Sequence, residues 1–247
     1  MPKFLNGSVI AVTHWNQRLC TLKIAVDFPP FEAGQFVSIG LEVDNKPYMR
    51  PYSLVNVPNR DFIEIYFNTV PEGSLSTSLY QRKVGDSLLV SKEAAGFFTL
   101  SEVPTGKHLW LIATGTGIGP YLSILGTSDP WERFEKIVLV QSVSTADELA
   151  YKVYIEALQA RYPEKLTTVY CVTREQVDGG LPHRIQQCFT NGTLEASAGV
   201  AISAKTSQVM LCGNRDMIQD MISMLASRGM KKSSRSKPGH ITTEHYY

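Results

Sequence analysis

Cysteine is scarce in this chain, and its spacing is not that of a metal site. The four cysteines, Cys20, Cys171, Cys188 and Cys212, lie apart, and no two of them form a CxxC pair. Zinc and iron–sulfur sites draw on closely spaced cysteines, so we expect no metal centre. The natural interpretation is free thiols in a reducing compartment.

Long apolar runs and a charge excess of either sign are also missing. No stretch approaches the roughly 18 apolar residues of a membrane-spanning helix. The N-terminal segment has neither the apolar core of a secretory signal nor the Arg- and Ser-rich composition of an organelle leader. With 24 Lys and Arg against 23 Asp and Glu, the net charge is +1, which argues against a broad nucleic-acid-binding face. We expect a cytoplasmic protein with no membrane and no nucleic-acid partner.

Short β-rich runs fill about the first 100 residues. Runs such as GQFVSIGLEV and FIEIYFNTV are separated by turn-forming segments such as DFPPFEAG, VDNKP and VPNRD. Short strands divided by Gly, Pro, Asn and Asp are typical of an antiparallel barrel or sandwich. One helix-like piece, SLSTSLYQRK (74–83), interrupts them.

The pattern then changes to strand, turn and helix. The apolar runs HLWLIAT, KIVLVQSV, LTTVYCVT and SQVMLCGN each precede a glycine turn or a helical pattern. Unbroken apolar strands alternating with helices indicate a doubly wound parallel sheet. We therefore predict an all-β domain at 1–100 and an α/β domain at 101–247, with the boundary in the loop at 101–107.

The first candidate site is the segment ATGTGIGP (113–120), which follows a buried strand and opens a helix. Backbone N–H groups at a helix start bind phosphate, and glycines let a pyrophosphate approach the main chain. The spacing departs from GxGxxG, and no acidic residue stands at the end of the next strand. No Lys follows the glycines, and this absence excludes a nucleoside-triphosphate loop. The alternative is a tight turn without a ligand. The strand–turn–helix context favours phosphate.

Two further candidates lie in the first domain. In RPYS (50–53), Arg50 suits a phosphate, Tyr52 offers a flat ring and Ser53 a hydroxyl. Strand alternation puts Ser53 on the opposite face, so the three converge only through a twist or bulge. In GSLS (73–76), a glycine leads into a helix start. The plain alternatives are a half-buried strand with an exposed arginine, and an ordinary helix cap by Ser74. Two phosphate-suited helix starts, one per domain, are what a flavin and a nicotinamide need.

Five segments in order carry a specific resemblance. RPYS (50–53), GSLS (73–76), GTGIGP (115–120), CGN (212–214) and EHYY (244–247) resemble motifs of ferredoxin–NADP reductases, and the resemblance covers the whole chain. The length and the segments EAAGFF and TTEHYY are most similar to the bacterial ferredoxin/flavodoxin–NADP reductases of the plant-type superfamily. The resemblance implies an N-terminal antiparallel β-barrel that binds FAD and a C-terminal α/β doubly wound parallel sheet that binds NADP, with a tail that returns to the flavin.

The resemblance assigns FAD to the first domain and the tail. It implies that Arg50 holds the FAD pyrophosphate, Tyr52 lies against the isoalloxazine and Ser53 contacts its reactive nitrogen. Tyr246 would cover the opposite face of the ring, and Tyr247 would extend along the adenine. The plain alternative for the tail is a last strand with its rings packed on the surface. The implied FAD residues are Arg50, Pro51, Tyr52, Ser53, Ser74, Leu75, Ser76, Thr116, Tyr246 and Tyr247.

NADP needs fixed positive charge at its 2′-phosphate, which NAD does not. The resemblance implies that Arg174, at a strand end, and Arg184, at a helix start, bind that phosphate. Taken singly, each is more simply a solvated arginine. Ser144 stands where the bacterial enzymes often have another arginine, so the preference for NADP is expected to be weaker or to rest on the other two. The implied NADP residues are Gly115, Gly117, Val143, Ser144, Thr173, Arg174, Arg184, Asn214, Arg215 and Asp216.

The resemblance also implies three catalytic residues: Ser53, Cys212 and Glu244. Cys212 matches a cysteine that abuts the nicotinamide, although a buried cysteine at a strand end is otherwise a small, inert hydrophobic residue. Glu244 matches a carboxylate that helps bind the nicotinamide and move protons in the plant enzymes.

Basic residues gather before the tail, namely Arg228, Lys231, Lys232, Arg235 and Lys237. Such a run is most often a solvated face. Beside a flavin edge it would attract the acidic surface of a ferredoxin or flavodoxin, and the resemblance favours this second interpretation.

The predicted function is a FAD-dependent oxidoreductase. It transfers a hydride between NADPH and FAD, and single electrons between FAD and ferredoxin or flavodoxin. One alternative is an NAD(P)H-dependent reductase of the same superfamily that serves free flavin, a haem protein or an oxygenase. Another is a non-catalytic flavin- or nucleotide-binding module of a larger complex. We expect a monomer.

Overall fold

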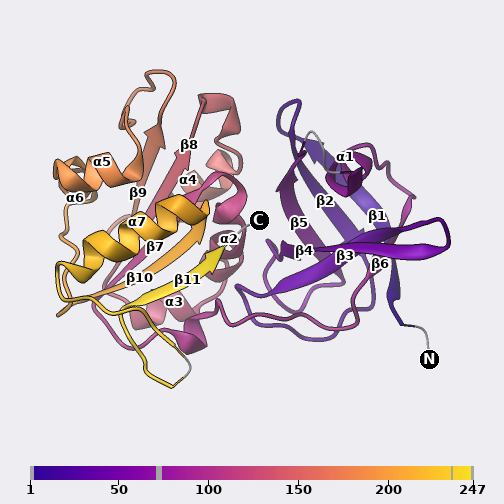
Figure 1. Ribbon diagram of the computed structural model, residues 1–247, viewed down its shortest axis with the longest axis horizontal. Coiled ribbons are helices and arrows are strands. Elements are labelled where there is room, and N and C mark those ends of the chain that lie inside the picture. Colours follow the sequence, from indigo (N-terminus) through magenta and orange to yellow (C-terminus); the bar gives the residue numbers. More distant parts are fainter. Residues whose placement is uncertain (1–2, 71–73, 235, 246–247) are drawn as a thin grey trace. The chain divides into compact units, whose positions relative to one another are not determined.

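The computed structural model describes residues 3–70, 74–234 and 236–245, which divide into two compact units (Figure 1). The first unit runs to Thr99 and also includes Gly119–Thr127. The second unit takes Leu100–Ile118 and the chain from Ser128 onwards. Short 3-10 helices punctuate the second unit: η1 (Leu100–Glu102), η2 (Gly115–Ile118) and η3 (Ala146–Glu148).

Antiparallel strands form the first unit, in the order β4-β3-β6-β1-β2-β5. They are β1 (Leu5–His14), β2 (Leu19–Ala25), β3 (Phe36–Val43), β4 (Lys46–Ser53), β5 (Phe62–Asn68) and β6 (Ser87–Val90). Leu54, directly after β4, bridges to Ile65 in β5, and the Val55 N–H donates to the Glu64 carbonyl at 2.9 Å. The outermost strands therefore meet and the sheet closes on itself. The predicted antiparallel barrel is confirmed.

Alternation of apolar and polar residues fills the barrel. In β2, Cys20, Leu22 and Ile24 point inwards and are fully buried. Helix α1 (Ser74–Tyr80) adds Leu75 and Leu79 to the same core. Each buried side chain of this size stabilises the fold by about 1.5–3 kcal/mol relative to leaving it exposed.

Asn56 braces the loop between β4 and β5. Its amide nitrogen donates to the carbonyls of Val57 and Phe62, and its amide oxygen accepts the Glu64 N–H at 2.7 Å. The Asn56 carbonyl accepts the hydroxyl of Ser123 on helix α2 (Gly119–Leu125) at 2.7 Å. Because these buried polar groups are paired, the corner that follows Ser53 is held in one conformation.

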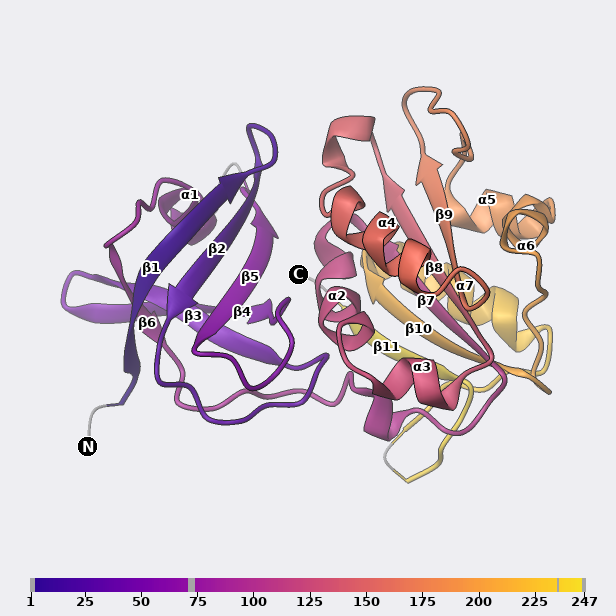
Figure 2. The same ribbon diagram turned by 180° about the vertical axis from the view of Figure 1, so that it is seen from behind.

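A parallel sheet organises the second unit, with strand order β11-β10-β7-β8-β9. Its strands are β7 (His108–Thr114), β8 (Lys136–Val143), β9 (Leu166–Val172), β10 (Ser207–Gly213) and β11 (Ile241–His245), and each pair runs parallel. One face is covered by α5 (Ile185–Thr190), α6 (Thr193–Ala198) and α7 (Arg215–Ala226) (Figure 1). Helices α3 (Asp129–Arg133) and α4 (Lys152–Arg161) lie on the other (Figure 2). The predicted doubly wound sheet is confirmed.

Helix α7 shows why this arrangement is stable. Met217, Ile218, Met221 and Leu225 recur at helical spacing and are buried in one continuous core that also includes residues of β7, β10 and β11. No helix in the described part of the chain is both long enough and apolar enough to span a membrane.

The segment before α4 departs from the expected pattern. The helical pattern DELAYKVYIEALQARY (147–162) predicts one helix beginning near Asp147, but the structure has η3, an interruption, and then α4 from Lys152. Tyr151 is the cause, because its φ of 61° lies in the left-handed region and cannot continue a right-handed helix.

Two glycines of the first unit allow a test of close packing. Gly34 and Gly85 have φ values of 103° and 96°. A Cβ at Gly34 would lie 2.1 Å from the Phe98 carbonyl oxygen, whereas one at Gly85 would meet nothing within 4 Å. Gly85→Ala is expected to cost about 1–2 kcal/mol for its backbone conformation alone. Gly34→Ala should lose about a further 1–3 kcal/mol by overpacking. Urea unfolding of both variants measures the difference, and equal losses would contradict the packing argument.

Candidate functional site

Two predicted catalytic residues are neighbours in the parallel sheet. Cys212 in β10 pairs with Ala113 in β7 on one side and with Glu244 in β11 on the other. Residues paired in this way point to the same face, so the thiol and the carboxylate lie side by side. Cys212 is fully buried and Glu244 is half-buried. All three residues lie towards the carboxyl ends of their strands, where ligands of α/β sheets bind.

The glycine turn after β7 forms the 3-10 helix η2. A Cβ at Gly117 would lie 2.6 Å from the Cys212 carbonyl oxygen, so a glycine is needed for the turn to pack against β10. A Cβ at Gly115 would meet nothing within 4 Å. The two glycines therefore differ, because Gly117 allows close packing of the turn against β10. Gly115, with φ 54°, borders open space, and a ligand needs such space to approach the main chain. Thr116 between them is half-buried.

The CGN segment (212–214) ends β10, contacts the end of β7 at Thr114 and leads into α7. Gly213 has φ 122°, and a Cβ there would lie 2.3 Å from the Thr114 hydroxyl oxygen. That oxygen accepts the Asn214 N–H at 2.7 Å. The Asn214 side-chain oxygen in turn accepts the N–H groups of Asp216 at 2.9 Å and Met217 at 3.1 Å, which caps the helix. Asn214, Arg215 and Asp216 are all exposed at this helix start.

The ends of β8 and β9 carry the predicted residues of the 2′-phosphate site. Thr173 donates its N–H to the Val143 carbonyl at 3.1 Å, and Arg174 donates its N–H to the Ser144 carbonyl at 2.9 Å. The side chains of Arg174 and Arg184 are exposed. Among the described residues, neither guanidinium has a hydrogen bond or an ion pair, so both are available to an anion.

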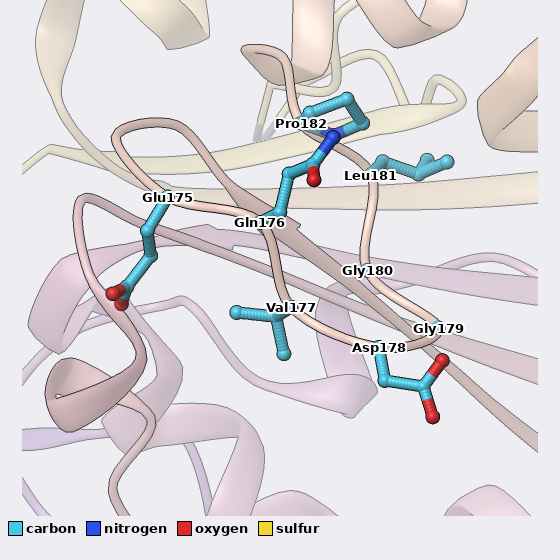
Figure 3. A pocket seen from close by; sticks show the side chains of 8 residues that line it. All are labelled: Glu175, Gln176, Val177, Asp178, Gly179, Gly180, Leu181 and Pro182. Carbon is cyan, nitrogen blue, oxygen red and sulfur yellow. The ribbon is translucent and has the colours of Figure 1, made fainter.

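Two carboxylates that the sequence analysis missed lie at the same strand end. The Ser144 N–H donates to Glu148 Oε2 at 2.9 Å, and the Ala146 N–H donates to Glu175 Oε1. Because the sequence has no acidic residue directly after β8, local pattern gives no sign of them. Only the folding of the two loops brings the Glu148 and Glu175 carboxylates to this strand end. Glu175 also begins a loop, residues 175–182, that lines a cavity of about 300 Å³ (Figure 3).

The RPYS segment of the first unit forms the end of β4. The register between β3 and β4 is continuous from Val43 opposite Lys46 to Phe36 opposite Ser53. Without a bulge, Arg50 and Tyr52 share one face and buried Ser53 lies on the other, as strand alternation predicted. The structure therefore brings two of the three residues together. Pro51 between them is exposed.

Arg50 and Tyr52 are held in different ways. The Arg50 guanidinium donates to the Met49 carbonyl at 2.8 Å and to the Tyr48 hydroxyl at 3.0 Å, and its carbon lies 4.4 Å from the Tyr48 ring centre. Tyr52 packs edge-on against Phe67, with ring centres 5.6 Å apart. Burial raises the pKa of Tyr52 to about 12, an effect that the nearby Arg50 charge only partly offsets. The hydroxyl of Tyr52 therefore stays protonated even well above neutral pH.

The remaining predicted FAD residues are placed only in part. Leu75 is buried in the barrel core, and the Ser76 hydroxyl oxygen accepts the Val70 N–H at 3.0 Å. Ser74 begins α1. Tyr246 and Tyr247 lie outside the described residues, so the predicted stacking of the tail on the flavin stays a prediction.

One member of the predicted basic surface is already paired. Arg228 donates to both carboxylate oxygens of Glu195, at 2.6 and 2.9 Å, and to the Ile202 carbonyl at 3.1 Å, and it lies over the Phe189 ring. Burial raises the pKa of Glu195, but hydrogen bonds from Arg228 and the Ile202 N–H, together with the Arg228 charge, lower it overall. Lys231, Lys232 and Lys237 are exposed, and Arg235 lies outside the described residues.

The described residues contain no group of three or more His, Cys, Asp or Glu side chains placed to hold a metal ion. The four cysteines are buried, and none of them forms a disulfide. Burial raises the pKa of the Cys20 thiol to about 12 and raises that of Cys171 beyond its usual range, so both are poor nucleophiles.

Known proteins that match this chain agree on its family. Residues 13–97 match the oxidoreductase FAD-binding domain family, and residues 111–222 match the oxidoreductase NAD-binding domain family. The chain is 43% identical to the flavodoxin/ferredoxin–NADP reductase of Escherichia coli K12, over 100% of both chains. The chain belongs to the flavodoxin/ferredoxin–NADP reductase family. The resemblance inferred from its motifs is confirmed.

Other members of the reductase family agree in sequence and structure. The ferredoxin–NADP reductase of Azotobacter vinelandii is 36% identical, over 96% of this chain and 95% of that protein. The crystal structure of a ferredoxin–NADP⁺ reductase from Neisseria gonorrhoeae, with bound FAD and NADP, matches with a TM-score of 0.95 at 29% identity and covers 100% of both chains. The predicted two-domain fold class is that of the reductase family.

Asn214 has a structural role that mutation can separate from any ligand role. Asn214→Ala removes the cap of α7 and is expected to cost about 0.5–2 kcal/mol of unfolding free energy. Asn214→Asp keeps an acceptor at the helix start and should restore stability to near the wild-type value. Urea unfolding of the two variants tests this, and an Asn214→Ala protein as stable as wild type would show that the cap contributes nothing.

Proposed function

We propose that the protein is a FAD-dependent oxidoreductase that transfers a hydride between NADPH and FAD, and single electrons between FAD and a ferredoxin or flavodoxin. The observation that carries the proposal is the match over the full length of both chains to a reductase named for flavodoxin, ferredoxin and NADP. A bound flavin supplies the step from two-electron to one-electron chemistry. The chain's own residues bind and orient the two nucleotides.

The first domain, residues 1–100, is assigned to FAD. Its support is the FAD-binding family match over residues 13–97 and the chemistry of RPYS. Arg50 uses two of its five N–H donors within β4, and the others, which have no partner among the described residues, suit a pyrophosphate. Tyr52 supplies a half-buried ring with a protonated hydroxyl, and Ser53 a hydroxyl at the barrel corner. From GSLS we assign Ser74, Leu75 and Ser76 to the same pyrophosphate, Leu75 through its main chain because its side chain is in the core.

The second domain, residues 101–247, is assigned to NADP. Gly115 borders open space, which fits a pyrophosphate close to the main chain. The guanidiniums of Arg174 and Arg184, which have no hydrogen bond or ion pair among the described residues, fit a dianionic 2′-phosphate. Val143, Ser144 and Thr173, together with the exposed start of α7 at Asn214, Arg215 and Asp216, complete the proposed nucleotide surface.

Cys212 and Glu244 are assigned to the nicotinamide end. A buried thiol gives a small apolar wall beside a planar ring, and the adjacent carboxylate can accept a hydrogen bond from a carboxamide or hold a proton. In this proposal Tyr246 covers the isoalloxazine, Tyr247 extends along the adenine, and Thr116 lies near both cofactors.

The electron-transfer partner is assigned by charge. Lys231, Lys232 and Lys237 are exposed and, unlike Arg228, have no ion pair among the described residues. They suit an acidic carrier such as a ferredoxin or flavodoxin, whose association would slow as salt screens the attraction. The cytoplasmic location and the monomeric state stay predictions.

The proposed function predicts a specific cofactor and reaction. The purified protein is expected to be yellow, to release FAD and not FMN on denaturation, and to reduce cytochrome c with NADPH only when a ferredoxin or flavodoxin is added. Absorbance spectra, chromatography of the released flavin and the coupled assay measure these properties. FMN, or no flavin after reconstitution, would overturn the assignment. FAD without NADPH turnover would leave a non-catalytic module.

The two arginines predict the choice of nucleotide. Arg174→Ala and Arg184→Ala should each lower kcat/KM for NADPH about ten- to a hundredfold, since one charge-assisted contact contributes about 1.5–3 kcal/mol. The values for NADH should change little, because that nucleotide has no 2′-phosphate. Steady-state kinetics with both nucleotides measures this, and Arg161→Ala, an exposed arginine on α4, serves as control. Equal losses with both nucleotides would show that the arginines do not bind the 2′-phosphate.

A further inference from the structure

Hydrogen bonds continue between β8 and β9 past the last paired residues of the two strands. Val143 and Val172 form the final register pair. Beyond them the Thr173 N–H donates to the Val143 carbonyl and the Arg174 N–H to the Ser144 carbonyl. The next bond runs in the opposite direction and uses a side chain, because the Ala146 N–H donates to the Glu175 carboxylate. Glu175 therefore fastens the loop after β9 to the loop after β8.

The direction of the Glu175 side chain separates it from the rest of its loop. Figure 3 shows it pointing away from the other residues that line the cavity and towards a neighbouring loop. An exposed carboxylate can form a surface ion pair with a nearby arginine. Here Glu175 instead binds the Ala146 N–H, and in the described part of the chain the Arg174 and Arg184 guanidiniums have no ion pair.

We propose that Glu175 is a positioning residue for the nucleotide. Its carboxylate binds the Ala146 N–H and so holds the main chain of Arg174 against the end of β8. Because the carboxylate is used in this bond, it does not pair with Arg174 or Arg184, and both guanidiniums remain available to an anion. The inference rests on the proposed function in one respect, that the anion is the 2′-phosphate of NADP. Glu175 would then favour NADPH although its own charge is negative.

Substitution separates the hydrogen bond from the charge. Glu175→Gln keeps an oxygen acceptor for the Ala146 N–H but has no charge, whereas Glu175→Ala has neither. If Glu175 acted only through its negative charge, both variants would bind NADPH more tightly than wild type. If it acts through its hydrogen bond to the Ala146 N–H, only Glu175→Ala should bind NADPH more weakly than wild type.

The same bond can be removed from its other partner. Ala146→Pro deletes the N–H and leaves Glu175 in place. Ala146 is the first residue of η3, a position that proline tolerates, and the preceding Thr145 is extended with φ −134° and ψ 159°, as the residue before a proline prefers. Asp178→Ala is the matched control, because Asp178 is an exposed acid in the same loop with no hydrogen bond or ion pair among the described residues.

The experiment measures KM and kcat of the FAD-loaded enzyme for NADPH and NADH, and the Kd of NADP⁺ and NAD⁺ from flavin difference spectra. Glu175→Ala and Ala146→Pro are expected to raise KM for NADPH and Kd for NADP⁺ about three- to tenfold, in the usual range of coupling between contacting residues. The kcat and both NADH values should remain unchanged, which also shows that the variants are folded. Glu175→Gln and Asp178→Ala should stay near wild type.

Several outcomes would overturn the inference. It falls if Glu175→Ala leaves NADPH binding unchanged, if Glu175→Gln loses as much as Glu175→Ala, or if either variant binds NADPH more tightly. Loss of NADH and NADPH turnover together would show a general structural role for Glu175. If the wild-type enzyme does not discriminate NADPH from NADH, the result would instead count against the proposed 2′-phosphate site. This outcome differs from a failure of the role proposed for Glu175.

Discussion

The close approach of main chain to main chain at the ends of β7 and β10 is the constraint on which the second unit depends. Gly117 lies against the Cys212 carbonyl, and Gly213 lies against Thr114, so a side chain at either glycine would force the two strand ends apart. The same contact aligns Ala113, Cys212 and Glu244 across three strands. The glycine turn, the cap of α7 and the predicted catalytic pair thus depend on two positions without a Cβ.

Much of the fold could be predicted from local pattern. Alternation placed Arg50 and Tyr52 on one face of β4 and Ser53 on the other, and the continuous register confirms it. The parallel strands were visible as unbroken apolar runs. The helices α3 and α6, with five and six residues, are too short for their periodicity to be read. The late start of α4 depends on the conformation of one residue, Tyr151, which its identity does not favour.

Site candidates could be named from the sequence where residues follow one another along the chain, whereas contacts that form across loops could not. Glu175 and Ala146 are 29 residues apart, and Arg228 and Glu195 are 33 apart. In the sequence Arg228 belongs to a basic run, and only the structure shows that its charge is already neutralised by a bidentate contact and so contributes little to an attractive surface. At Arg228, the charge counted along the sequence overestimates the charge that a partner meets.

The corner after Ser53 is the point at which the barrel closes. There the chain stops pairing with β3 and begins pairing with β5, and Asn56 holds that exchange with three side-chain hydrogen bonds. If the proposed role of Ser53 is right, the residue at this exchange would also contact the reactive part of the flavin. The bonds that close the barrel would then also fix the backbone beside the flavin, so a change at Asn56 would affect both the stability of the barrel and the position of Ser53.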